Sequence, residues 1–118
     1  MAWPEGGQVN GALRMRDIID LRGASGAYYR FRSCPSAAEH LPMAGNYAFV
    51  RTEAGRPKVL VLGQCGNLSQ LPQKWPKGSD PADTQLYTRL NVSRMARIAE
   101  HDDLAAHYTN AKLDSSVE

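Results

Sequence analysis

Acidic and imidazole side chains gather between residues 100 and 107 of the 118-residue chain, where they could hold a metal ion. If this segment is helical, Asp103 and His107 share a face with Glu100, because they follow it by three and seven positions. Carboxylate oxygens suit a hard divalent cation such as Mg²⁺ or Mn²⁺. Two structural interpretations stay open: a solvated charged helix face, and a surface ion pair between Glu100 and Arg97, one helical turn earlier.

Basic residues dominate the chain before this acidic segment. Up to Arg97 there are 13 Lys and Arg against 7 Asp and Glu, a balance of +6, whereas from Ile98 onward one Lys stands against five Asp and Glu, a balance of −4. A basic surface beside an acidic cluster is compatible with nucleic acid held near a metal ion, because phosphates need cations and a metal needs carboxylates. A solvated surface with an acidic tail has the same composition.

A tryptophan lies between two lysines in the segment 74–77. Trp75 can stack on a base while Lys74 and Lys77 neutralise phosphates, which is a pattern of nucleic-acid binding. The alternative is that Trp75 folds back as a lid on the core.

The secondary structure expected around these residues belongs to one small α+β domain. Periodicity, alternation and turn residues predict these elements in order: a helix over 15–21, a strand over 27–32, a hairpin with strands over 47–53 and 58–62, an exposed loop over 73–83, a strand over 85–92, and a helix from Ser93 to about Tyr108. This order predicts a mostly antiparallel sheet with flanking helices. Residues 1–12 are expected to form a loose arm, 13–43 an N-terminal helix and strand, and 111–118 a frayed tail.

The second strand of the hairpin should lie at the centre of the sheet. Its segment Val59-Leu60-Val61-Leu62 is apolar on both faces. Only a strand that is covered on both sides tolerates that pattern.

Size and composition exclude several classes of protein. A chain of 13.0 kDa with 42% hydrophobic and 22% charged residues is expected to form a single globular domain. No apolar run approaches the roughly 20 residues that cross a bilayer, and the first residues do not resemble a secretory signal. Two cysteines, Cys34 and Cys65, cannot make a disulfide framework, so a reduced cytoplasmic protein is expected.

Three segments resemble the motifs of the GIY-YIG nucleases. Gly45-Asn46-Tyr47 is similar to the Gly-Ile-Tyr strand start, residues 61–68 are similar to the segment that begins Tyr-Ile-Gly, and residues 97–104 resemble the helix that carries the metal-binding glutamate. The resemblance covers about residues 44–110 and implies a GIY-YIG-like core there. Two family positions differ: Val61 stands where the family has a tyrosine, and Leu71, followed by a proline, stands where it has an arginine.

The resemblance implies a nuclease that cleaves DNA or RNA backbones with a divalent metal. Tyr47 would assist proton transfer, and Glu100 would hold Mg²⁺ or Mn²⁺. Phosphodiester hydrolysis also needs a cation against the developing charge, which Arg51, Arg89 or Arg97 would have to supply in place of the missing arginine.

Two functions follow from these patterns. The first is a divergent nuclease with Tyr47 and Glu100 as catalytic residues, and with nucleic-acid contacts from five residues: Arg51, Lys74, Trp75, Lys77 and Arg97. The second is a catalytically inactive module that binds nucleic acid or a protein partner, because two catalytic groups of the family are missing. The nuclease requires Tyr47 and an arginine to converge on Glu100 in an open cleft.

Overall fold

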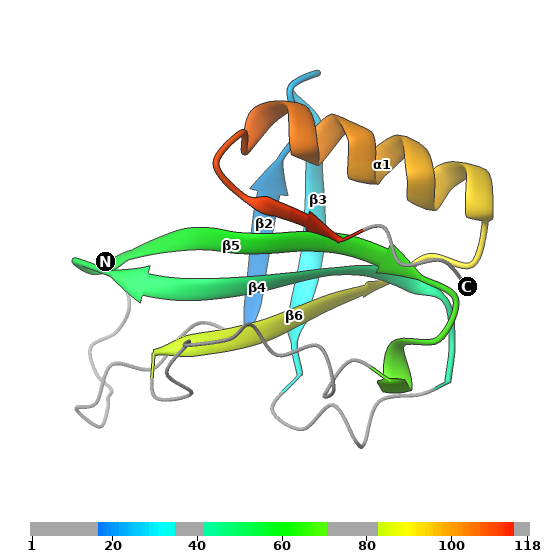
Figure 1. Cartoon of the computed structure of the whole chain (residues 1–118), viewed down its shortest axis with the longest axis horizontal. Helices are drawn as coiled ribbons and strands as arrows, with labels where there is room; N and C mark the ends of the chain where they lie inside the picture. Colours follow the sequence, from blue (N-terminus) through cyan, green and yellow to red (C-terminus); the bar gives the residue numbers. More distant parts are fainter. Residues whose placement is uncertain (1–16, 35–41, 71–82, 115–118) are drawn as a thin grey trace.

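The computed structural model describes residues 17–34, 42–70 and 83–114, which form one six-stranded sheet and one long helix (Figure 1). The elements are β2 (Ile18–Arg22), β3 (Tyr28–Ser33), β4 (Gly45–Glu53), β5 (Arg56–Cys65), β6 (Thr84–Leu90), α1 (Arg94–His107) and β7 (Lys112–Asp114). The strand order is β2-β3-β6-β4-β5-β7, in which only the pair β5–β7 is parallel. The predicted α+β class with a mostly antiparallel sheet is therefore confirmed.

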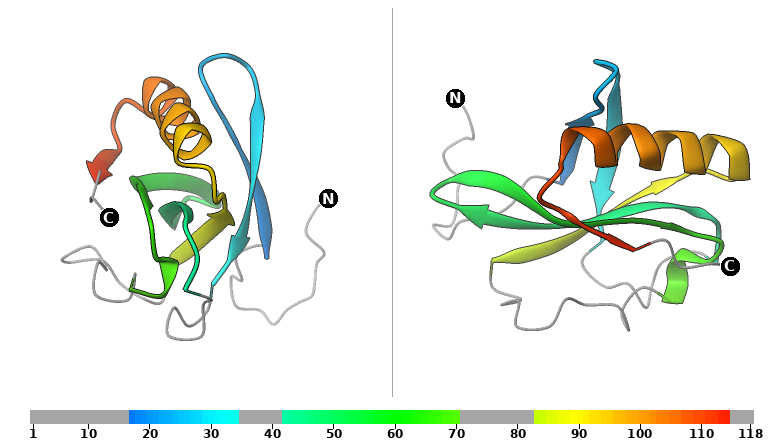
Figure 2. Two further views of the ribbon diagram at one scale, coloured as in Figure 1. Left: turned by 90° about the vertical axis from the view of Figure 1, so that its right-hand side faces the viewer. Right: turned by 45° about the horizontal axis from the view of Figure 1, so that its top comes forward.

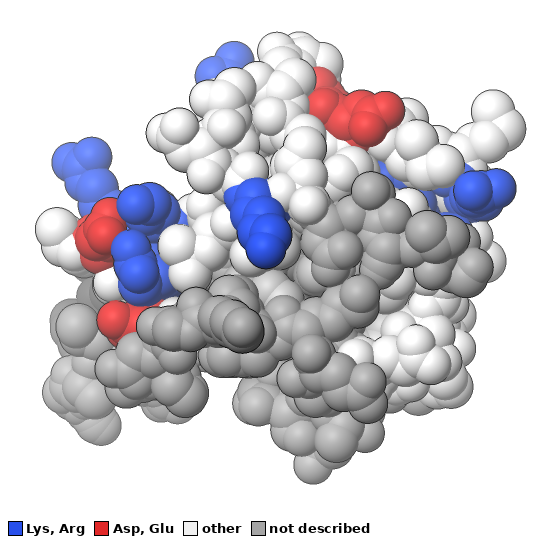
Figure 3. All heavy atoms as spheres, in the orientation of Figure 1, with Lys and Arg blue, Asp and Glu red and all other residues white. Residues whose placement is uncertain are grey.

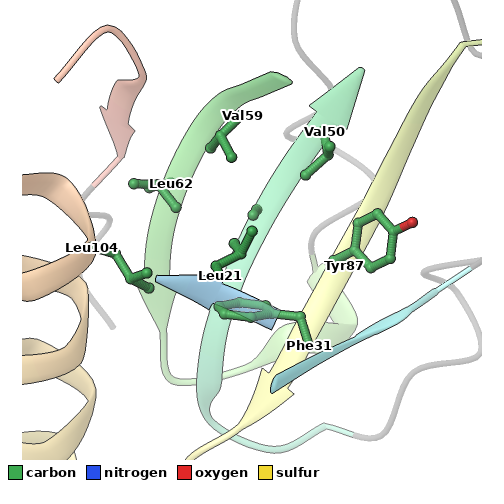
Figure 4. Close-up of a cluster of buried hydrophobic side chains, with 8 residues drawn as sticks. Leu21, Phe31, Val50, Val59, Leu62, Tyr87 and Leu104 are labelled. Carbon is green, nitrogen blue, oxygen red and sulfur yellow. The ribbon is translucent and has the colours of Figure 1, made fainter. Parts of the chain in front are cut away.

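The sheet is curled, and α1 lies inside the curl. Figure 2 shows the hairpin of β2 and β3 turned steeply away from β4, β5 and β6, with the helix between this hairpin and the other end of the sheet. One apolar cluster fills the space beneath the helix (Figure 4); its buried members are Leu21, Phe31, Ala48, Val50, Val59, Leu62, Tyr87 and Leu104. We call this side of the sheet the helix face.

A second apolar cluster covers the opposite side of the sheet, which we call the far face. Its buried members are Tyr47, Phe49, Val61, Cys65, Leu68 and Leu86. Side chains alternate along a strand, so Ala48 and Val50 of β4 point to the helix face whereas Tyr47 and Phe49 point to the far face. β4 is consequently buried on both sides over most of its length.

The predicted strand over 27–32, the hairpin, the strand over 85–92 and the helix that begins after Ser93 are confirmed, with shifts of a few residues at their ends. The β4–β5 hairpin closes through Ala54 and Gly55, whose φ angles of 53° and 78° both lie in the left-handed region, as a tight two-residue hairpin turn requires. The Ser93 side chain accepts a hydrogen bond from the backbone amide of Ala96, which caps α1, and Tyr108 ends the helix. Local signals in the sequence are therefore sufficient for this region.

Three predictions about the elements need correction. Residues 18–22 form strand β2 rather than a helix, because Ile19 and Leu21 alternate with exposed residues and the segment pairs with β3. The tail is not frayed throughout, since β7 pairs with β5 between Val61 and Gly63. β4 and β6 occupy the middle of the sheet, and β5 lies next to its edge, although Val61 and Leu62 show that β5 is covered on both faces. The arm 1–12 and most of the loop 73–83 lie outside the described residues.

Candidate functional site

Glu100 lies between α1 and the sheet, where an arginine and an asparagine engage its carboxylate. Nε of Arg89, from β6, is 2.8 Å from Oε1 of Glu100, and Nδ2 of Asn91 is 3.0 Å from the same oxygen. The Glu100 side chain keeps 19% of its surface exposed and that of Arg89 keeps 30%. Glu100 thus pairs with Arg89 of the neighbouring strand, not with Arg97 of its own helix.

Arg97 extends the same network toward the start of the helix. It is only 4% exposed, and its Nε donates to Oε1 of Gln64 at 3.1 Å while its Nη1 donates to the carbonyl oxygen of Val92 at 2.9 Å. Asn46, on the helix face of β4, donates to the carbonyl of Arg97 and accepts from Asn91. We call the set Asn46, Gln64, Arg89, Asn91, Arg97 and Glu100 the polar seam.

The hydrogen bonds of the polar seam connect α1 to three strands at once. Gln64 belongs to β5, Asn46 to β4 and Arg89 to β6. Buried polar groups are stable when they are hydrogen-bonded to one another. The geometry of the seam therefore fixes the helix on the sheet, and Arg97, predicted to contact nucleic acid, is buried within the seam.

A second set of hydrogen bonds anchors the β2–β3 turn to the helix. The Asp103 carboxylate accepts from the Ser25 hydroxyl at 2.6 Å, from the Ser25 amide at 2.8 Å and from the Tyr29 hydroxyl at 2.7 Å. The hydrogen bonds from Ser25 and then Tyr29 lower the pKa of Asp103, and the bond to Asp103 raises the pKa of Tyr29. The guanidinium of Arg89 lies 5.5 Å from the centre of the Tyr29 ring, which joins this anchor to the polar seam.

Tyr47 lies on the other side of the sheet from Glu100. It is fully buried in the far-face cluster, with its ring edge-to-face against Phe49 at a centroid distance of 6.0 Å. Glu100 projects from the helix that covers the helix face. The structure brings an arginine to Glu100 but not Tyr47, so the expected pair of catalytic residues does not converge on one point.

The side chains around Glu100 do not fit a divalent metal. One carboxylate oxygen is already engaged by a guanidinium, whose positive charge opposes a second cation. Among the described residues, no group of three or more His, Cys, Asp or Glu side chains is placed to hold an ion. Asp103, expected on the same helix face as Glu100, is engaged by Ser25 and Tyr29 instead.

Basic residues gather near the turn of the β4–β5 hairpin. In the sheet register, Arg51 is opposite Lys58 and Glu53 is opposite Arg56, so these four side chains share one face of the hairpin. Arg51 follows Val50 of the helix face, so that face is the far face. Lys112 of β7 is beside Val61 of the far face, and therefore projects on the same side. We call Arg51, Arg56, Lys58 and Lys112 the cation cluster.

Among the described ion pairs, a single acidic residue, Glu53, engages cations of the cation cluster. Glu53 pairs with Arg51 at 2.9 Å and lies 3.7 Å from Lys58. Figure 3 shows the basic groups of the hairpin end and of the central surface on one side of the molecule, with acidic groups among them at the hairpin end. Within the described part of the chain, Arg56 and Lys112 make no ion pair. These two cations and Lys58 are exposed to solvent.

Of the two predicted nucleic-acid contacts that the structure describes, Arg51 lies in this cluster and Arg97 does not. Arg97 is buried in the polar seam, and Lys74, Trp75 and Lys77 lie outside the described residues. The prediction did not include Arg56, Lys58 or Lys112. For Arg56 and Lys58 a signal exists, because two basic residues at alternate positions after a hairpin turn must share one face of the strand.

No family model, curated protein or solved structure matches this chain. The resemblance to the GIY-YIG nucleases therefore stays a prediction from the motifs. None of the helices in the described residues has the length and apolar composition that a membrane crossing demands.

Proposed function

We propose that the chain is a catalytically inactive binding module that holds a nucleic-acid backbone on the cation cluster. The observation that carries this proposal is the placement of Arg51, Arg56, Lys58 and Lys112 on one side of the sheet. Such a cluster binds the phosphates of a nucleic acid whatever its base sequence, and each phosphate that is neutralised releases counterions. Binding is consequently weak, independent of sequence and strongly reduced by salt.

The position of Glu100 favours binding over hydrolysis. A catalytic carboxylate must be open to a metal or to water, and this one accepts hydrogen bonds from Arg89 and Asn91. Tyr47 has no exposed surface from which to reach a substrate. Both residues are accounted for by folding, whereas the cation cluster, within the described part of the chain, is a surface that a polyanion can reach.

The test is fluorescence anisotropy with labelled single-stranded DNA, duplex DNA and RNA at several salt concentrations. The double variant Arg56→Gln and Lys58→Gln should bind nucleic acid more weakly. The fall of log affinity with log salt should also become less steep, by about two in slope, because the variant removes two phosphate contacts. The control is the double variant Arg22→Gln and Arg32→Gln, which removes two exposed arginines of β2 and β3 outside the cluster. Equal losses in the double variant and in the control would indicate a net-charge effect and contradict the proposal.

A plasmid-nicking assay with Mg²⁺ and Mn²⁺ addresses the claim of inactivity. The purified protein should not nick the plasmid even at high concentration, and Glu100→Ala should leave the anisotropy signal unchanged. Nicking that needs metal and disappears in Glu100→Ala would overturn the proposal and support the nuclease.

A further inference from the structure

The helix α1 presents a mostly apolar stripe to solvent. Arg97, His101 and Leu104 are the residues it buries against the sheet. The residues on the opposite side are exposed and have the spacing of a coiled-coil seam, four, three and four positions apart: Met95, Ala99, Asp102 and Ala106. Met95 is 83% exposed, and Ile98, which flanks the stripe, is 37% exposed.

The stripe contains a single charge, and a complementary charge lies at the start of the helix. Asp102 is on the stripe, and Arg94 is in the first turn. Neither makes an ion pair within residues 17–34, 42–70 and 83–114, and both are exposed. In Figure 3 the surface over α1 is mostly white, with an acidic group over the helix and basic groups at its N-terminal end.

We infer that the stripe on α1 binds the same stripe of a second copy of this chain, with the two helices antiparallel. A two-fold axis at the level of Ile98, next to Ala99, places Arg94 of each copy beside Asp102 of the other, so the surface is complementary to itself. A parallel pair would instead place Asp102 against Asp102, which is repulsive. The small Ala99 side chains at the crossing let the helices approach, and Met95 fills the space beside them with a flexible apolar chain.

The length of the helix limits the strength of this dimer. With Arg94 opposite Asp102, the two helices overlap over residues 94–102, about 13 Å of helix, so the contact is at the small end of specific interfaces. The dimer therefore dissociates on dilution, and its two salt bridges are weakened by added salt.

Sedimentation equilibrium over a range of protein concentrations tests the charge complementarity. Arg94→Asp and Asp102→Arg should each raise the dissociation constant about tenfold or more, and the double variant should restore dimerisation. The matched control is Arg56→Asp, an exposed arginine in the hairpin, which should leave the dimer intact. A monomer at every concentration, or a dimer that neither single reversal weakens, would overturn the inference.

Cysteine cross-linking tests the antiparallel geometry. Ala99→Cys lies near the two-fold axis, so oxidation should join two copies, whereas Ala106→Cys is too far from its symmetry mate to react. The unmodified chain, with Cys34 and Cys65, is oxidised in parallel as the background. Cross-linking at both positions would indicate parallel helices, and cross-linking at neither would exclude this contact; either result contradicts the inference.

Discussion

The two faces of the sheet are built on different principles, although they share the same strands. On the helix face, an apolar cluster lies beside the polar seam, whose guanidinium, carboxylate and amide groups satisfy one another. On the far face, the buried cluster is apolar apart from the tips of Tyr47 and Cys65, and the charges stay at its margin in the cation cluster. Charges that are satisfied internally hold the fold together, whereas charges at a margin are open to a ligand.

Neighbouring residues of β4 show how sharply the two faces are separated. Asn46 joins the polar seam, and Tyr47, the next residue, lies in the far-face cluster. A shift of one residue along a strand exchanges the faces. The motif Gly45-Asn46-Tyr47 therefore delivers its amide, not its phenol, to the vicinity of Glu100.

The largest expected effect comes from placing a charge in the far face. Val61→Asp puts a carboxylate where the native residue is 8% exposed among apolar side chains, and should cost about 3–5 kcal/mol of unfolding free energy. Urea denaturation or the thermal midpoint measures the loss. Leu113→Asp, at a position on β7 that is 51% exposed, is the control and should change stability by about 0.5 kcal/mol or less. An unchanged midpoint in Val61→Asp would show that β5 is not covered.

A smaller loss is expected from an apolar substitution in the polar seam. Arg97→Met keeps the length of the side chain but leaves Gln64 and the Val92 carbonyl without a donor, which should cost about 2–3 kcal/mol. Arg32→Met, at an exposed position of β3, is the matched control. Nucleic-acid affinity in the anisotropy assay should be the same for Arg97→Met as for the native chain, and a selective loss of affinity would mean that the seam is part of the binding surface.

The smallest effect depends on pH and concerns the anchor between Asp103 and the β2–β3 turn. Because the folded-state pKa of Asp103 lies below its ordinary value of 3.8, its stabilisation is complete above that value and is lost as pH falls through the folded pKa. The thermal midpoint of the native chain should therefore be higher than that of Asp103→Asn at neutral pH, and the difference between the two midpoints should shrink in acid. Asp102→Asn in dilute solution is the control. A difference that is constant with pH would show that the carboxylate charge is not what Ser25 and Tyr29 stabilise.

Much of the fold could be predicted because its signals are local. Short runs of aromatic, β-branched and other apolar residues mark β4, β5 and β6, and Ser93 marks the start of α1. The segment that became β2 was misread because its apolar residues fit both periods, and pairing with β3 decides between them. β7 could not be predicted, since three residues contain no pattern and the strand exists only through its contact with β5.

The site was less predictable because its contacts join residues far apart in sequence. The spacing of Glu100 and Arg97 suggested an ion pair along the helix, whereas the ion pair in the structure is between Glu100 and Arg89 of β6. Nothing in the local sequence shows that Ser25 would bind Asp103. Residue type identified groups able to do chemistry, and only the packing of α1 across the sheet determined which of them face one another.

The strand order also has a consequence for the speed of folding. β6 lies between β3 and β4. The sheet is therefore continuous only after β6 has paired with both strands, Tyr87 with Ser33 of β3 and Arg89 with Asn46 of β4. Two local hairpins, β2–β3 and β4–β5, can form early, but the chain must close long loops to join them, and distant contacts slow a folding reaction. We expect substitutions in β6 to slow refolding. Substitutions at the β4–β5 turn should slow refolding if that hairpin forms before the transition state, and should speed unfolding if it forms later.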